Sequence, residues 1–315
     1  MKRLFLSVLF LLSFSSLRAE SQDVYVGIFL NDVINVDLRT NTYIFDFYLW
    51  FRWQGEKDPS DSFEFINASD TWSHTWEKTY ETPKLIHGWK YQSLHINGNF
   101  HHPFFLGSYP LDEQDLVVGI EDVTSNQEGI RYIADVENTS YRKDINMPSW
   151  NILNHSIVAA PYTYPTSFGD PQNLEKPDRY SRVTFKVRIS RNKQLYLFKM
   201  LLPILIVLLC TFILFLINPE YSDARLALAI TALVSAVALH ITVSGDLPQV
   251  GYLVLIDKIY NLCYFAIFLA LAETVYTTYL KDKGLIVRAK KLDKISFVGL
   301  LVLFLTMCVY LTSYA

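Results

Sequence analysis

The chain has 315 residues, of which 51% are hydrophobic and only 19% are charged, below the roughly 25% charge typical of soluble domains. This composition argues against intrinsic disorder and against a wholly soluble protein. The formal net charge of −3 provides no basic field, which argues against nucleic acid as a partner. The sequence contains no GxGxxG, P-loop, HExxH or CxxC motif, so we expect neither a cofactor nor an enzyme.

Residues 1–19 have the pattern of a secretory signal peptide. Lys2 and Arg3 precede an apolar stretch at residues 4–12, and small residues follow up to Ala19. The alternative is an anchor helix, but so short an apolar stretch cannot span a membrane core about 30 Å thick. We therefore expect the segment after Ala19 to be exported.

Residues 20–194 predict an exported β domain. Short, aromatic-rich, alternating runs occupy residues 24–30, 43–53, 116–120, 131–136, 152–158 and 182–190. Asn97-Gly98 is typical of a hairpin turn, and residues 161–177 are expected to form a functional loop. Many short strands at this spacing predict an antiparallel, immunoglobulin-like sandwich.

Residues 195–315 predict an all-α, four-helix transmembrane domain. Four stretches, at about 196–217, 223–244, 257–280 and 294–315, approach the ~20 residues that a membrane helix needs. The basic loop 281–294 is predicted to be cytoplasmic by the positive-inside rule. Four spans then place both the exported domain and the C-terminus outside an inner (plasma) membrane, in agreement with the signal peptide.

One stripe of the second span is suited to line either a pore or a close helix contact. At 100° per residue, the stripe carries small, hydroxyl and branched apolar side chains. Its members are Ala227, Thr231, Val234, Ala238, Ile241 and Gly245. Small residues also let membrane helices pack closely, so the stripe alone leaves both interpretations open.

Four polar residues in or beside the spans have predicted positions. Asp223 lies about 40° from the centre of the stripe, whereas Arg225 points away from it. His240 lies opposite the stripe and is predicted to form hydrogen bonds between helices. Glu273, an acid within the third span, is a functional candidate that faces water or a partner.

Several segments together resemble a known family. The run Tyr109-Pro110-Leu111-Asp112-Glu113-Gln114 resembles an aromatic-Pro-x-Asp loop signature, and Arg191 and Pro203 stand before and within the first span. With Asp246-Leu247-Pro248 after the second span, the order resembles that of the pentameric ligand-gated ion channels, the Cys-loop receptor superfamily. No cysteine flanks Pro110 or Asp112, so the chain is similar to prokaryotic members, which lack that disulfide.

The resemblance implies a homopentamer of this subunit in a lipid bilayer, with the second span around the pore. Asp223 would then ring the cytoplasmic mouth and favour monovalent cations. It also implies that Asp37, Asp112, Arg191 and Pro248 couple the two domains, with Arg191 between both carboxylates. The alternative for these charges is an ordinary surface ion pair, which contributes about 1 kcal/mol or less.

The resemblance further implies an agonist pocket between subunits, gated by a small molecule or by protons or hydroxide. The corresponding positions are Tyr48, Phe65, Glu121, Val123, Tyr162, Tyr164 and Tyr180. Val123 stands where the family has an aromatic residue, which weakens an amine-binding cage. Ordinary packing is the alternative for each tyrosine, and Trp72 with Trp76 could line a second, vestibule-facing pocket or belong to the core.

Two other functions compete with a channel. A membrane-tethered periplasmic sensor or binding protein without conduction would need a cytoplasmic effector, and only about fourteen residues are expected on that side. A membrane enzyme or small transporter would need several intramembrane ionisable groups, whereas the predicted spans contain His240 and Glu273.

Overall fold

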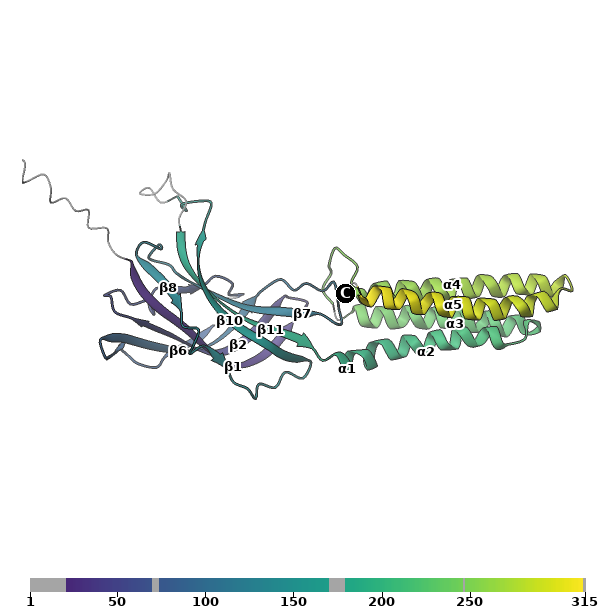
Figure 1. Cartoon of the computed structure of the whole chain (residues 1–315), viewed down its shortest axis with the longest axis horizontal. Helices are drawn as coiled ribbons and strands as arrows, with labels where there is room; N and C mark the ends of the chain where they lie inside the picture. The colour runs from purple at the N-terminus through teal and green to yellow at the C-terminus, as the bar shows by residue number, and fades with distance from the viewer. Residues whose placement is uncertain (1–20, 70–73, 170–178, 246, 314–315) are drawn as a thin grey trace, which may run out of the picture.

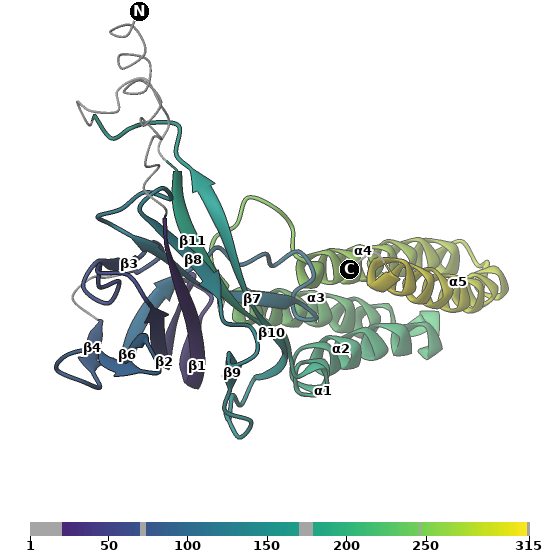
Figure 2. The same cartoon turned by 60° about the vertical axis from the view of Figure 1, so that its left-hand side comes forward.

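The computed structural model describes residues 21–69, 74–169, 179–245 and 247–313, so the expected signal peptide lies outside the described residues. The molecule is elongated, with a β-sandwich at one end and a helical bundle at the other (Figures 1 and 2). The sandwich precedes the bundle along the chain, as the sequence predicts.

The larger sheet has seven strands, of which β1 is the longest. Its order is β4 (Thr75–Lys78), β6 (Trp89–His101), β2 (Thr42–Trp53), β1 (Gln22–Asp37) and β8 (Ile130–Ala134). β5 (Lys84–Ile86) pairs with β6, and β9 (Ser140–Tyr141) pairs with β1. The pairs of β1 with β8 and β9 are parallel, whereas the other pairs are antiparallel, so the sheet departs from the predicted purely antiparallel pattern.

The smaller sheet is fully antiparallel. Its order is β10 (Trp150–Thr163), β11 (Arg179–Arg191), β7 (Glu113–Asp122) and β3 (Phe63–Phe65). β10 continues to Thr163, so Pro161 lies in a strand rather than at the start of the predicted loop. An edge strand tolerates proline because one side of its backbone needs no ladder hydrogen bond.

Alternating side chains of both sheets form the core. In β2, every second residue from Tyr43 to Trp53 is buried, and β11 buries Val183 to Ile189 in the same way. The Tyr43 hydroxyl donates to Val117 O (2.5 Å) and accepts from Val117 N (2.7 Å), which joins β2 to β7 of the other sheet. Asn67 adds bonds to Val117 O (2.8 Å) and from Gly119 N (3.0 Å).

The predicted hairpin turn at Asn97-Gly98 is wrong. β6 runs straight through both residues, and they pair with Asp46 and Phe45 of β2. A Cβ on Gly98 would lie 2.3 Å from Cδ2 of His74, so the glycine makes room for this ring. Close packing against His74 therefore explains the glycine, and the local sequence does not reveal this contact.

The bundle contains four long helical segments. The first comprises α1 (Lys193–Tyr196), the π-helical η2 (Leu197–Leu201), α2 (Leu202–Ile213) and η3 (Leu214–Leu216). The others are α3 (Ser222–Ser244), preceded by η4 (Pro219–Tyr221), α4 (Leu255–Asp282) and α5 (Ile286–Ser313). Among the described residues, three stretches are long and apolar enough to cross a membrane: Phe198–Leu216, Pro219–Ser244 and Leu255–Asp282. The predicted fourth span at about 294–315, which falls on α5, is not among them.

The segment expected as a basic loop is mostly helical. α5 begins at Ile286, so Arg288, Lys290, Lys291 and Lys294 lie on its first turns, and only a short turn separates it from α4. α5 packs on α4 and ends beside the sandwich (Figure 1). Hydrophobic residues on α2, α4 and α5 remain exposed in the single chain, as expected of helices that contact lipid.

Candidate functional site

One face of α3 is left uncovered by the chain's own helices. The side facing the bundle buries Arg225, Ala229, Ala232 and Ala236. The opposite side exposes Val234 by 63% and Ile241 by 69%. All residues of the predicted stripe lie on this exposed side: Asp223, Ala227, Thr231, Val234, Ala238, Ile241 and Gly245. Their exposure is compatible with a pore wall and with a helix contact between copies.

Hydroxyl groups on this face bond to their own helix. Thr231 Oγ1 donates to Ala227 O (2.8 Å), and Thr242 Oγ1 donates to Ala238 O (2.9 Å). Each hydroxyl oxygen therefore keeps its lone pairs for a partner outside the helix. These oxygens can coordinate water or a cation on the exposed face.

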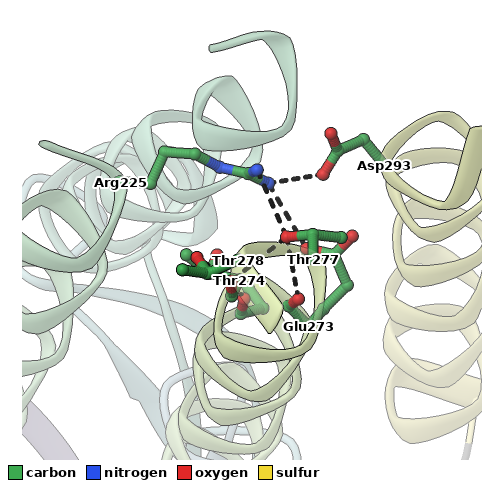
Figure 3. A network of polar contacts seen from close by, with 7 residues as sticks. Arg225, Glu273, Thr274, Thr277, Thr278 and Asp293 are labelled. Atoms are coloured by element: carbon green, nitrogen blue, oxygen red, sulfur yellow. Dashed lines mark hydrogen bonds and ion pairs between the residues drawn. The ribbon is translucent and has the colours of Figure 1, made fainter. Parts of the chain in front are cut away.

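A buried arginine joins three helices at the other end of α3 from the sandwich. Arg225 Nη2 lies 2.5 Å from Asp293 Oδ1 of α5 and 3.4 Å from Glu273 Oε2 of α4 (Figure 3). Arg225 Nη1 donates to Thr277 Oγ1 (3.3 Å). The prediction that Arg225 points away from the stripe is confirmed, and Glu273 binds a helix partner rather than standing alone.

His240 forms the predicted bonds between helices. Its Nδ1 lies 2.9 Å from the Tyr264 hydroxyl, and its Nε2 lies 3.0 Å from Asp257 Oδ1, both on α4. The imidazole stacks on the Tyr260 ring, with centroids 4.6 Å apart. His240 therefore links the sandwich-proximal halves of α3 and α4.

Arg191 occupies an aromatic cage between the two domains. Its Nε donates to Asp112 Oδ1 (2.6 Å) and its Nη1 to the Tyr196 hydroxyl (3.0 Å). Its guanidinium lies 4.2 Å from the Trp150 ring centroid and 4.7 Å from that of Tyr109. Arg191 is only 4% exposed, so this is a buried ion pair and not a surface one.

The predicted pairing of Arg191 with Asp37 is wrong in this structure. Asp37 Oδ1 instead accepts from Arg39 N (2.8 Å), because the turn after β1 folds back on itself. Asp37 and Arg191 nevertheless line the same cavity of about 400 Å³. Among the described residues, Arg191 Nη2 has no hydrogen-bond partner.

Other contacts connect the sandwich to the loop between α3 and α4. Leu255 N donates to Gly107 O (3.0 Å), and Leu106 N donates to the Tyr252 hydroxyl (3.0 Å). Arg39 Nη2 donates to Gly245 O at the end of α3. Pro248 is partly exposed and lines a separate cavity with Leu247 and Tyr252, whereas Asp246 lies outside the described residues.

Four of the predicted ligand residues come together on the outer face of the smaller sheet. The Tyr164 hydroxyl donates to Glu121 Oε2 (3.0 Å), and the Tyr164 ring contacts those of Tyr162 and Tyr180, with centroids 4.8 and 5.8 Å away. Burial and the bond to Glu121 raise the pKa of Tyr164. The cluster is therefore both polar and aromatic.

A cation of the chain itself occupies this cluster. Arg182 Nε donates to Glu121 Oε1 (2.5 Å), its Nη2 donates to the Tyr164 hydroxyl (3.1 Å), and its guanidinium lies 3.7 Å from the Tyr162 centroid. Glu64 is the cross-strand neighbour of Glu121, and burial together with the Glu121 charge raises the pKa of Glu64. An amine ligand would have to compete with Arg182 for the Tyr162 ring.

The other predicted ligand residues lie elsewhere. Tyr48 is exposed on the larger sheet and stacks on His95, with centroids 4.6 Å apart. Phe65 packs into the aromatic core against Phe47 and Phe100, and Val123 is exposed just beyond β7. Trp76 is exposed beside Phe63, whereas Trp72 lies outside the described residues.

Sequence reasoning missed Arg182, Trp150, Tyr196 and Tyr252. Arg182 alternates with the buried residues of β11, so strand periodicity would have placed it on the same outer face as Tyr180. Trp150, Tyr196 and Tyr252 make contacts between distant segments, and no local pattern marks them.

Comparisons with known proteins agree with this layout. No known family profile matches the chain. A gamma-aminobutyric acid receptor subunit beta of Lymnaea stagnalis is 27% identical over 176 residues, which cover 55% of this chain and 33% of that protein. A proton-gated ion channel of Gloeobacter violaceus is 26% identical over 203 residues, which cover 64% of this chain and 54% of that protein.

The matches thus span between a third and about half of the length of these relatives. One is named as a receptor subunit and the other as an ion channel, and neither name is that of an enzyme. The sandwich followed by a helical bundle, with several helices able to cross a membrane, describes a multi-pass membrane protein with an extracellular type of β domain. Over part of its length the chain is thus similar to a receptor subunit and to an ion channel, in agreement with the resemblance to the pentameric ligand-gated ion channel superfamily.

Proposed function

We propose that five copies of this chain surround a water-filled path lined by the exposed face of α3. The observation that carries the proposal is the division of α3 into two faces. Arg225 and the three small alanines bind the chain's own helices, whereas Val234 and Ile241 are exposed. A single helix cannot enclose a path, so the exposed face needs symmetric copies around an axis.

The chemistry of the exposed face supports conduction with a gate. Rings of Val234 and Ile241 are apolar enough to close a narrow path by excluding water. Thr231 adds a hydroxyl ring, and Asp223 adds an acidic ring at the cytoplasmic end. Acidic rings favour cations, so the proposed channel passes monovalent cations.

The proposed stimulus is chemical and acts on the exported domain. The cluster of Glu121, Tyr164 and Arg182 joins β7, β11 and the loop after β10, at the outer face where a neighbouring copy could present Tyr48. A small polar ligand would bind there, or protons would alter the acidic row of Glu64 and Glu121. The proposed location is an inner membrane with the sandwich on the periplasmic side.

Two measurements test the proposal. Native mass spectrometry in mild detergent should detect a pentamer, and a stable monomer or dimer would contradict it. Currents across a reconstituted bilayer, recorded over a range of pH and with a panel of amines and carboxylates, should identify the stimulus. A pentamer that never conducts would favour the tethered periplasmic sensor.

A further inference from the structure

The buried cluster around Arg225 joins one guanidinium to two carboxyl groups. Arg225 is 0% exposed, and its guanidinium contacts the carboxyl groups of Asp293 and Glu273 (Figure 3). A buried arginine is tolerated only when its charge is paired, because an unpaired buried charge is strongly destabilising. Arg225 Nε and Glu273 Oε1 have no partner among the described residues, so Arg225 is held through its two terminal nitrogens.

The cluster lies beside the proposed cytoplasmic mouth but on the opposite side of α3. Asp223 and Arg225 are two residues apart, which places them about 200° apart around a helix. Asp293 belongs to α5, which packs on α4, and α4 in turn packs on α3. This contact fixes the rotation of the first turn of α3.

We infer that Asp293 and Glu273 determine ion selectivity by holding Arg225 away from the pore and neutralising its charge. This inference rests on the proposed channel function. Without the two carboxylates, five uncompensated guanidinium groups would surround one mouth and oppose the Asp223 ring. In this way α5, which does not line the path, influences through Asp293 which ions the path admits.

The test compares variants that differ by one charge. Glu273→Gln/Asp293→Asn leaves Arg225 unpaired, and Arg225→Gln/Glu273→Gln/Asp293→Asn removes that charge as well. Asp282→Asn is the control, because this acid is on the same helix as Glu273 and its side chain is 66% exposed. Each reversal potential is measured in a NaCl gradient, and each pentamer fraction by native mass spectrometry.

The expected result is a fall of about tenfold in the sodium-to-chloride permeability ratio of the double variant, because five uncompensated cations then lie close to the mouth. The triple variant and Asp282→Asn should keep the wild-type ratio. A conducting double variant with the wild-type ratio overturns the inference. If the double variant does not assemble, assembly of the triple variant supports charge compensation, and failure of both shows that the carboxylates serve only packing.

The experiment distinguishes failure of this inference from failure of the proposed channel function. A wild-type protein that does not conduct contradicts the channel itself. The pentamer fractions of the double and triple variants would still report whether the carboxylates compensate Arg225.

Discussion

Substitution of Arg191 by alanine should uncouple the sandwich from the helices. The variant removes the ion pair to Asp112, the bond to the Tyr196 hydroxyl and the contacts with the Trp150 and Tyr109 rings. Asp112 is only 3% exposed and would keep Gln114 Nε2, at 2.6 Å, as its remaining side-chain donor. A buried carboxylate would then lack its counter-charge.

The expected cost follows from this burial. Removing one partner of a buried ion pair destabilises a protein by about 3–5 kcal/mol. If the pair forms in only one gating state, the same energy shifts the gating equilibrium by about a hundredfold to a few thousandfold, since 1.4 kcal/mol corresponds to a factor of ten. An exposed ion pair contributes about 1 kcal/mol or less.

Arg131→Ala is the matched control. Arg131 binds Asp23 through two bonds of 2.6 and 2.7 Å, but the side chains are 52% and 39% exposed. Thermal unfolding of purified pentamers and stimulus–response curves should show large losses for Arg191→Ala and small ones for Arg131→Ala. Arg191→Gln/Asp112→Asn should regain thermal stability, because no buried charge remains unpaired. Equal behaviour of Arg191→Ala and Arg131→Ala would refute the reasoning.

Three further predictions concern the mouth, the acidic row and the ligand cluster. Asp223→Ala should move the reversal potential in a NaCl gradient toward that of chloride, and an unchanged value would remove Asp223 from the selectivity ring. Glu64→Gln should raise the melting temperature at neutral pH, because the raised pKa of Glu64 means that the fold disfavours its ionised form. The difference in melting temperature between variant and wild type should vanish below the ordinary pKa of 4.5, where Glu64 is neutral like the glutamine that replaces it. A difference that stays constant with pH would contradict this. Tyr180→Ala and Tyr48→Ala should each change the stimulus concentration for half-maximal current, and unaltered responses to every effective stimulus would place the site elsewhere.

Periodic features were predictable from the sequence, and contacts between distant segments were not. Alternation along residues 43–53 identified a strand of the core, and the helical wheel placed Arg225 and His240 away from the exposed face of α3. Their partners depend on how whole helices pack: Asp293 is 68 residues beyond Arg225, and no pattern near either residue connects them.

The errors have the same origin. Asn97-Gly98 has the composition of a turn, yet the glycine accommodates His74 from another segment. Asp37 was expected beside Arg191 by resemblance, whereas Asp37 binds the backbone of its own turn and the aromatic rings surround Arg191. The first outcome depends on tertiary packing, and the second combines a local turn at Asp37 with tertiary packing of the rings around Arg191.

The hydroxyl of Tyr43 has a mechanical consequence. It bonds to both backbone groups of Val117 and thereby fastens the larger sheet to the smaller one inside the core, with Asn67 reinforcing the same point. Sliding of one sheet over the other would break these bonds, so we expect the sandwich to tilt or rotate as a stiff lever, and rapid hydrogen exchange at Val117 would contradict this. A stimulus at one end of such a lever reaches the other without internal deformation. The hinge of the molecule is then confined to the thin layer where Arg191, Tyr252 and Leu255 meet.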